Sequence, residues 1–328
     1  MLTIEHIQSA QQRIKPYIHQ TPIISSQLLN QCLGHKILFK VEAQQKVGAF
    51  KARGGINAVA QIVERGEKPQ MIVANSSGNH AQAVAWAAQQ FALPATIYMP
   101  ANVSAVKAKA TASYGANIEL IATRQGVDEA VAKAAAQPNV YWIPPYNHID
   151  VMAGQGTCAL ELSGQIDQFD ALFAPCGGGG LLSGSYVACQ HIDKRIQVCG
   201  VEPLTANDAA NSRRAGKIIA LDGPTMTLAD GARTPSVGPL TFPFIQQLNE
   251  FYEAPEADII YWTQWLTHLL KLTVEPTSAM TMFGVCEWLK QQNTQKQVVV
   301  ILTGGNIDCA TRAKIWQHDR LQELPSLQ

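Results

Sequence analysis

The chain has 328 residues, and its 25 Lys and Arg are balanced by 25 Asp and Glu, so the formal net charge is zero. Charged residues make up only 15% of the chain, which excludes a whole-molecule field that attracts nucleic acid or an anionic membrane. Hydrophobic residues make up 47%, enough to bury a large core, which excludes a disordered protein.

Seven cysteines are scattered along the chain without a C-x-x-C pair, so neither a disulfide framework nor a thiolate zinc site is indicated. A reducing cytoplasm is the expected location. Residues 1–20 form a polar helical pattern rather than a signal peptide, and no apolar run reaches the roughly 18 residues that span a bilayer. We therefore expect a cytoplasmic protein with no membrane and no nucleic-acid partner.

Short runs rich in β-branched residues alternate with Ala-rich segments of helical length, which is typical of βαβ units and a largely parallel sheet. In chain order, the pattern predicts strand 71–77, helix 80–92, strand 95–99, helix 104–113, strand 117–122, helix 127–136, helix 155–167, strand 170–174, helix 181–191, strand 196–201, helix 278–291 and strand 297–302. Residues 203–255 carry no strong period, so we expect ordered loops and short helices there.

Two breaks interrupt this alternation, one near residues 64–70 and one at Pro144-Pro145. The segment between them has the pattern of a compact βαβαβα unit inserted into a larger one. We predict a small domain over 66–147 that closes over a cleft. The remaining ranges, 1–65 and 148–328, form a discontinuous large domain.

Strand-to-helix turns are where ligands bind in open parallel sheets, and two of these turns are unusual. Ser76-Ser77-Gly78-Asn79-His80 opens an Ala-rich helix, so its free N–H groups and the helix dipole favour an anion such as a carboxylate. A good helix cap without a ligand explains this turn equally well.

Four glycines in succession, Gly177, Gly178, Gly179 and Gly180, follow the strand predicted at 170–174. Such a run loses much conformational entropy on folding, which favours a phosphate held by backbone amides over a mere connection. A dinucleotide is the alternative, with Glu202 at the distance of a ribose contact. That fingerprint is weak, because Leu182 or Ser183 stands where its third glycine belongs.

Two further segments contain polar residues that point to a ligand only when they are considered together with the first two turns. Thr303-Gly304-Gly305-Asn306 ends the most apolar strand, and taken alone it is an ordinary strand exit. Lys51, in Gly48-Ala49-Phe50-Lys51, lies in an apolar, Gly-flanked segment, although most lysines are solvated. Burial would disfavour its ammonium form and yield a nucleophilic amine.

Together and in this order, the four motifs resemble the fold-type II pyridoxal-phosphate enzymes, and most closely the serine/threonine dehydratases and serine racemases. The similarity extends from about Ile4 to Thr311, with supporting stretches Lys40-Val41-Glu42, 153–157 and Glu275-Pro276-Thr277. The resemblance implies an α/β fold similar to the tryptophan synthase β chain, with two open, twisted, mostly parallel sheets and helices on both faces. It also suggests a homodimer.

The resemblance implies a role for each motif in binding the cofactor. Lys51 would hold pyridoxal 5′-phosphate as a Schiff base, with Phe50 packed beside the ring. Asn79 would hydrogen-bond the phenolic oxygen of the ring. Thr303 would face the pyridine nitrogen, where the family has a hydroxyl residue. The phosphate would bind the glycine run and the backbone of the next residue, Gly177, Gly178, Gly179, Gly180 and Leu181.

The resemblance also implies the reaction, which is removal of the Cα proton by Lys51 followed by loss of the β-hydroxyl. L-Threonine would give 2-oxobutanoate and L-serine pyruvate, each with ammonia. The substrate carboxylate would be held by the first turn, Ser76, Ser77, Gly78, Asn79 and His80. Ser77 matches the residue that faces Lys51 across the Cα in the racemases. Serine racemase and threo-3-hydroxyaspartate dehydratase are therefore alternative main activities.

A metal site is implied by a further match to the racemase-like branch. Glu202, the Ala206 carbonyl and Asp208 keep the spacing of residues that bind a divalent ion in that branch. Oxygen ligands suit Mg²⁺, with Ca²⁺ or Mn²⁺ as alternatives. Without a metal, the same residues would form a capped strand exit with solvated carboxylates.

Rival hypotheses from other classes are a nicotinamide-dependent oxidoreductase, built on the glycine run and Glu202, and a non-catalytic protein that binds an amino acid or a nucleotide. The first leaves Lys51 and the serine-rich turn unexplained. The side-chain pocket of the substrate falls on loops 144–150 and 230–238, whose pattern does not choose between amino acids. Arg124 and Arg233 are candidates for holding a second carboxylate if the substrate is a dicarboxylic acid.

Overall fold

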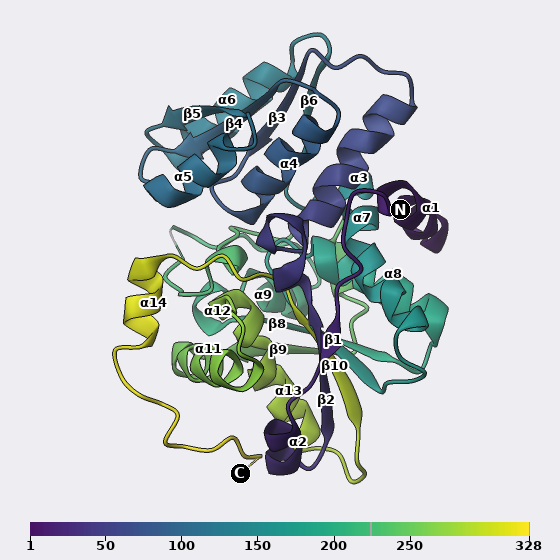
Figure 1. Cartoon of the computed structure of the whole chain (residues 1–328), viewed down its shortest axis with the longest axis vertical. Coiled ribbons are helices and arrows are strands. Elements are labelled where there is room, and N and C mark those ends of the chain that lie inside the picture. Colours follow the sequence, from purple (N-terminus) through teal and green to yellow (C-terminus); the bar gives the residue numbers. More distant parts are fainter. Residues whose placement is uncertain (224, 328) are drawn as a thin grey trace.

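A computed structural model describes residues 1–223 and 225–327 and contains two separate β-sheets (Figure 1). The larger sheet has the strand order β1 (Ile23–Ile24), β2 (Lys36–Val41), β10 (Gln297–Leu302), β7 (Ala171–Pro175), β8 (Gln197–Pro203) and β9 (Glu250–Ala254). Only the β1–β2 pair is antiparallel among the pairs of this sheet in the described ranges. The smaller sheet is wholly parallel, in the order β5 (Asn117–Ile121), β4 (Ala95–Pro100), β3 (Met71–Asn75) and β6 (Val140–Trp142).

Helices cover both faces of each sheet. The described helices are α1 (Ile4–Ile14), α2 (Gln27–Leu33), α3 (Lys51–Glu64), α4 (Asn79–Gln90), α5 (Ala105–Ala112), α6 (Arg124–Ala135), α7 (Ile149–Leu160), α8 (Gly180–Ile192), α9 (Asp208–Ala215), α10 (Phe242–Ile245), α11 (Glu256–Leu270), α12 (Pro276–Ala279), α13 (Thr281–Leu289) and α14 (Cys309–Ile315). Short 3-10 turns include η1 (Glu42–Gln44), η3 (Glu161–Gly164) and η5 (Asp230–Ala232). The predicted α/β class with mostly parallel sheets is confirmed.

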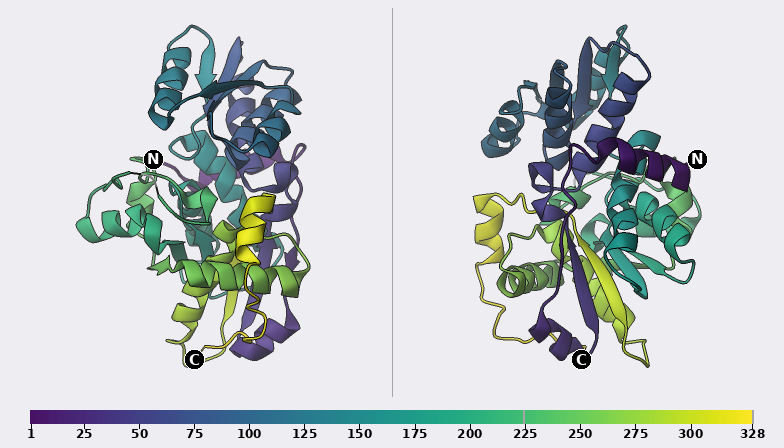
Figure 2. Two further views of the ribbon diagram at one scale, coloured as in Figure 1. Left: turned by 90° about the vertical axis from the view of Figure 1, so that its left-hand side faces the viewer. Right: turned by 45° about the vertical axis from the view of Figure 1, so that its right-hand side comes forward.

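The two sheets lie at opposite ends of the molecule, with α3 and α7 between them (Figures 1 and 2). Residues 71–142 contain all four strands of the small sheet. The division into a small unit over 66–147 and a large unit over the remaining ranges stays a prediction. No helix in the two described ranges is long and apolar enough to cross a membrane.

Strand β10 shows why the large sheet is buried on both faces. After its first residue, Gln297, the strand is entirely apolar and almost inaccessible to solvent. Val299 and Ile301 pack into the core beneath α7 and α8, whereas Val298, Val300 and Leu302 pack into the core beneath α11 and α13. Because both faces of this central parallel strand are buried, all of its side chains from Val298 onward are apolar.

Several predicted elements have different bounds in the structure. The strand predicted at 71–77 ends at Asn75, and the helix predicted at 278–291 is divided into α12 and α13. Helix α7 spans Ile149–Leu160 rather than 155–167. Strand β9 has no counterpart among the predicted strands, because it is a short, half-exposed edge strand in a segment without strong period.

Glycines in α7 and α8 allow these two helices to touch backbone to backbone. A Cβ atom on Gly184 would lie 2.6 Å from the backbone nitrogen of Gly156 and 2.6 Å from the carbonyl oxygen of Met152. A Cβ atom on Gly154 would lie 2.5 Å from the carbonyl oxygen of Arg53 in α3. These glycines are therefore contact points between helices.

We predict that Gly184→Ala lowers the free energy of unfolding by about 1–3 kcal/mol or more, because two backbones must move apart. Gly164→Ala is the matched control, since a Cβ atom there would meet nothing within 4 Å, and its effect should stay within about 0.5 kcal/mol. Urea unfolding measures both. Equal stability of the two variants would contradict this account of the α7–α8 contact.

Candidate active site

Lys51 is the first residue of α3, and its amine faces the protein interior. The Nζ atom donates a hydrogen bond to the carbonyl oxygen of Pro145 at 2.6 Å and lies 5.2 Å from the centroid of the Phe50 ring. Burial lowers the pKa of Lys51 to about 8. A substantial fraction of the amine is therefore uncharged near neutral pH, as a nucleophile or a base requires.

The residues that follow β10 hydrogen-bond the segment that leads into α3. The N–H of Phe50 donates to the carbonyl oxygen of Thr303 at 2.9 Å, and the Asn306 side chain donates to the carbonyl oxygen of Val47 at 2.7 Å. These bonds join two segments about 250 positions apart in the sequence. They place the T-G-G-N turn directly beside Lys51.

The glycine run turns the chain from β7 into α8. The N–H groups from Gly177 to Leu181 have no backbone acceptor within the described residues, and they surround the N-terminus of α8. Gly179 has a φ of 87°, and a Cβ atom on Gly177 would lie 2.8 Å from the carbonyl oxygen of Gly231. Open amides at a helix N-terminus form a phosphate site.

The segment after β6 links Lys51 to the glycine run. Pro145 accepts the hydrogen bond from Lys51, and the next ring, Tyr146, lies over the run so closely that a Cβ atom on Gly178 would be 2.2 Å from ring carbons. The Tyr146 hydroxyl donates to the carbonyl oxygen of Ser236 at 3.0 Å. The amine and the candidate phosphate site therefore share one wall.

The serine-rich turn precedes α4 and borders open space. The N–H groups of Asn79, His80 and Ala81 have no backbone acceptor within the described residues, and a Cβ atom on Gly78 would meet nothing within 4 Å. The half-buried hydroxyls on this turn belong to Ser76 and Ser77, and the former accepts from the N–H of Gly78. A carboxylate fits these donors.

His80 can contribute to this turn only as a neutral group. Its Nε2 atom lies 2.8 Å from the carbonyl oxygen of Ile143, and the side chain is almost fully buried. Burial, reinforced by the charge of Lys51, lowers the pKa of His80 to about 3. The ring therefore anchors α4 to the end of β6, and its backbone N–H remains open to an anion.

Asn79 is held at both ends of its amide. Its Nδ2 donates to both carboxylate oxygens of Glu275, at 3.0 and 3.2 Å, and its Oδ1 accepts from the Asn306 side chain at 2.8 Å. Burial raises the pKa of Glu275 to about 7. This arrangement leaves the second N–H of the Asn79 amide as a donor of fixed direction.

Thr303 ends β10 as a buried hydroxyl. Its Oγ1 atom lies 2.8 Å from Oγ of Ser278, which also donates to the carbonyl oxygen of Gly304 at 3.3 Å. Thr303 is 2% exposed. A ring nitrogen placed beside it would meet a neutral hydroxyl rather than a carboxylate.

The predicted metal ligands lie together at the end of β8. Glu202 accepts from the N–H groups of Ala209 and Ala210, at 3.2 and 2.7 Å, and Glu202 and Asp208 are each 1% exposed. Burial raises the pKa of Glu202 to about 9 and that of Asp208 to about 7. Neither Asp208 side-chain oxygen has a hydrogen-bond partner within the described residues.

Such a pair of buried carboxylates next to the Ala206 carbonyl fits a divalent cation, which would replace the missing partners. No group of three or more His, Cys, Asp or Glu side chains in the two described ranges could hold a metal ion. A site here would depend on two carboxylates, a backbone carbonyl and water.

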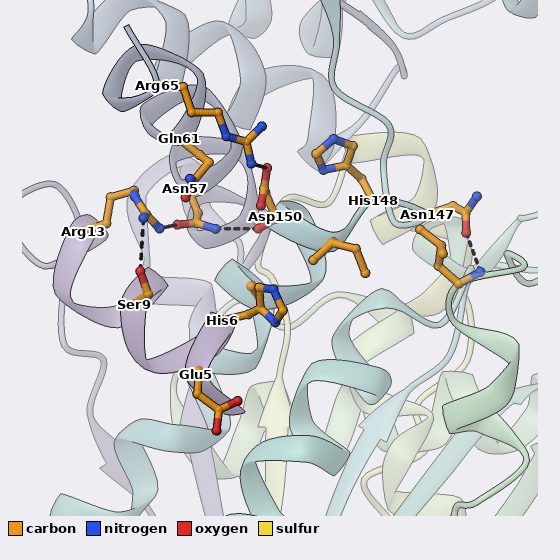
Figure 3. Close-up of a pocket in the computed structure, with 13 residues that line it drawn as sticks. Glu5, His6, Ser9, Arg13, Asn57, Gln61, Arg65, Asn147, His148 and Asp150 are labelled. Atoms are coloured by element: carbon orange, nitrogen blue, oxygen red, sulfur yellow. Dashed lines mark hydrogen bonds and ion pairs between the residues drawn. The ribbon is translucent and has the colours of Figure 1, made fainter. Parts of the chain in front are cut away.

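A polar hollow of about 610 Å³ lies elsewhere, between α1, α3 and the start of α7 (Figure 3). Both arginines that line it are paired, Arg13 with Glu64 and Arg65 with Asp150. None of the predicted catalytic, cofactor or metal residues lines it, but Asn147, His148 and Asp150 of the loop predicted for the substrate side chain do.

The structure thus brings Lys51, Phe50, Asn79, Thr303 and the glycine run into one connected group. The sequence motifs assign no role to several of its members, Pro145, Tyr146, Glu275, Ser278 and Asn306. The last of these stands in the T-G-G-N turn, and Glu275 stands in a stretch that carries the resemblance, so both have a signal. The other three become apparent only through contacts.

The chain as a whole is similar to known proteins. The family model described as "Pyridoxal-phosphate dependent enzyme" matches residues 14–304. L-threo-3-hydroxyaspartate ammonia-lyase from Saccharomyces cerevisiae is 41% identical over 93% of this chain and 94% of its own, and serine racemase from Schizosaccharomyces pombe is 37% identical over the same shares. The crystal structure of threonine deaminase from T.th. has a TM-score of 0.87 at 36% identity, covering 93% of this chain and 99% of that chain.

We predict that the amine of Lys51 in the cofactor-free protein reacts with trace acetic anhydride with a pH midpoint of about 8. The same residue in urea-unfolded protein is the control, and its midpoint should return toward the ordinary pKa of 10.5. Mass spectrometry of the peptide that contains Lys51 measures both curves. Coinciding midpoints would show that burial does not shift the pKa of this amine.

Proposed function

Because the chain belongs to the family of pyridoxal-phosphate-dependent enzymes, we propose that it is an ammonia-lyase that eliminates the β-hydroxyl group of a small 3-hydroxy amino acid. The observation that carries this proposal is the desolvated Lys51 amine between a cradle of open amides and a second helix N-terminus. The nicotinamide alternative does not fit, since Glu202 is buried and bonded to backbone amides instead of facing a ribose.

The residues present fit the cofactor. The phosphate would bind the open N–H groups of Gly177 to Leu181, and Phe50 would pack beside the ring. Asn79 would donate its remaining N–H to the phenolic oxygen, and Thr303 would bond the ring nitrogen. When bound, pyridoxal phosphate supplies an electron sink for the bond broken at the substrate Cα.

Lys51 would both anchor the cofactor and accept the Cα proton. Its lowered pKa keeps part of the amine uncharged, and the Pro145 carbonyl orients that amine without adding a charge that would favour the ammonium form. Ser77, on the turn before α4, would face the substrate from the other side. The open N–H groups of Asn79 and His80 would hold the substrate carboxylate.

L-Threonine and L-serine are the first substrates of this proposal, giving 2-oxobutanoate and pyruvate. A second candidate is 3-hydroxyaspartate, favoured by the similarity to L-threo-3-hydroxyaspartate ammonia-lyases that are 41% and 37% identical. Arg124 and Arg233 are the candidates for binding its second carboxylate. The positive charge of Arg124 acts to lower the pKa of Tyr146, which lies over the glycine run. The Arg233 side chain donates a hydrogen bond to the carbonyl oxygen of Thr227. Racemisation of serine is the third, favoured by the serine racemases among the relatives and by the resemblance of Ser77 to the residue that faces the lysine in that branch.

We further propose that Glu202, Ala206 and Asp208 bind Mg²⁺, or Ca²⁺ or Mn²⁺ in its place. The unpartnered oxygens of Asp208 support this site. A homodimer, suggested by the resemblance, and a cytoplasmic location, suggested by the unpaired cysteines, belong to the same proposal.

Lys51→Ala should lower ammonia release by roughly 10⁴-fold or more, because it removes both the cofactor anchor and the proton acceptor. Lys68→Ala, on an exposed loop, is the control and should leave turnover unchanged. The assay compares L-serine, D-serine, L-threonine and L-threo-3-hydroxyaspartate, with chiral chromatography for racemised serine. Full activity of Lys51→Ala would overturn the proposal, and the preferred substrate would choose among its candidates.

Mg²⁺ should stabilise the folded protein by about 2.7 kcal/mol at a concentration 100 times its dissociation constant. Asp208→Asn should abolish this stabilisation, because it removes a charged ligand. Asp222→Asn, which changes an exposed carboxylate outside the cluster, is the control and should retain it. Thermal unfolding with Mg²⁺ and with EDTA measures the effect, and an identical response of both variants would exclude this site.

A further inference from the structure

One ion pair joins a helix beside the small sheet to a 3-10 turn beside the large sheet. Lys107, on α5, places its Nζ atom 2.5 Å from a carboxylate oxygen of Asp230, in η5. We propose that this pair is a latch that fixes the distance between the two halves of the active site, so that Lys107 and Asp230 are positioning residues for amino-acid binding. This inference rests on the proposed function.

No other ion pair in the described part of the chain crosses between residues 66–147 and the rest of the protein. Neutral hydrogen bonds also cross this boundary, such as the one from Tyr146 to Ser236. The Lys107–Asp230 pair is therefore the charged contact by which α5 can recognise a closed arrangement.

Lys107 enters an acidic environment formed by three separate segments. Asp230 comes from η5, Asp308 caps α14, and Glu275 precedes α12. The Lys107 side chain is only 19% exposed. Burial by itself would lower the pKa of Lys107, but these facing carboxylates raise it above the ordinary value, so the side chain remains a cation at neutral pH.

The latch connects directly to both binding regions. On the side of the large sheet, Gly231 follows Asp230 in η5. Its N–H donates to the hydroxyl oxygen of Thr277 at 3.0 Å, and its carbonyl oxygen lies close to Gly177 of the glycine run. On the small sheet, α5 packs against α4, whose first turn carries the open N–H groups proposed for the substrate carboxylate. Asn79 in that turn also bonds Glu275 and Asn306, so separating Lys107 from Asp230 would loosen the spacing between those donors and the phosphate cradle rather than release it fully.

The contact predicts a specific kinetic effect. The Lys51 amine and the amides of the glycine run do not depend on α5, so the cofactor should stay bound when the latch is broken. The substrate carboxylate depends on the spacing between the sheets. Loss of the latch should therefore raise KM for the amino acid by up to about fivefold, because a partly exposed ion pair contributes about 1 kcal/mol at most, while cofactor absorbance is retained.

Charge reversal separates an ion pair from a general packing effect. The variants are Lys107→Glu, Asp230→Lys and the double exchange, in the cofactor-loaded protein, with Lys109→Glu as control because Lys109 is exposed on the same helix. Steady-state ammonia release gives KM and kcat, and small-angle X-ray scattering gives the radius of gyration. If a single reversal fails to fold, Lys107→Met and Asp230→Asn test the same contact.

We expect each single reversal to raise KM and the radius of gyration, the double exchange to recover at least half of both changes, and Lys109→Glu to match the wild type. Single variants that match Lys109→Glu, or a double exchange no better than its parents, would overturn the latch. If no protein releases ammonia from any amino acid, the proposed function fails, while scattering still decides whether the latch exists.

Discussion

A buried group of four charges under the first turn of α3 fixes the site. Arg53, two residues after Lys51, bonds Glu42 and Glu161 at 2.7 Å each, and Lys40 bonds Glu161 at 2.6 Å. The two positive charges balance the two negative ones, and all four side chains are nearly inaccessible. Because removal of one partner strands a buried charge at about 3–5 kcal/mol, the group holds α3 in one register against β2, η1 and η3.

Much of the fold and the main chemistry could be predicted from the sequence, because both depend on local patterns. A parallel strand buried on both faces reads as a continuous apolar run, as in β10, and polar turns directly after such strands mark the ligand edge. The glycine run, Asn79 and Thr303 all lie on turns of this kind, whereas Lys51 lies at the start of α3, after two short 3-10 turns. The structure places Thr303 next to Phe50, which no local pattern indicates.

The rest depends on contacts between distant segments. Pro145 enters the site through a backbone oxygen, which any residue carries, and Ser278 enters through its position beneath Thr303. Helix α7 begins earlier than the sequence pattern indicates, and its Gly154 and Gly156 permit backbone contact with α3 and α8. A residue type alone does not distinguish a flexible turn from a close approach.

In the proposed site, anions would meet backbone dipoles rather than full positive charges. The α4 and α8 N-termini supply open N–H groups, His80 is neutral, and Thr303 meets Ser278 instead of a carboxylate. This choice protects the Lys51 amine, whose pKa a neighbouring carboxylate would raise. The acceptor that orients this amine, the carbonyl oxygen of Pro145, carries no net charge, so the Lys51 amine is held in place and is still free to lose its proton.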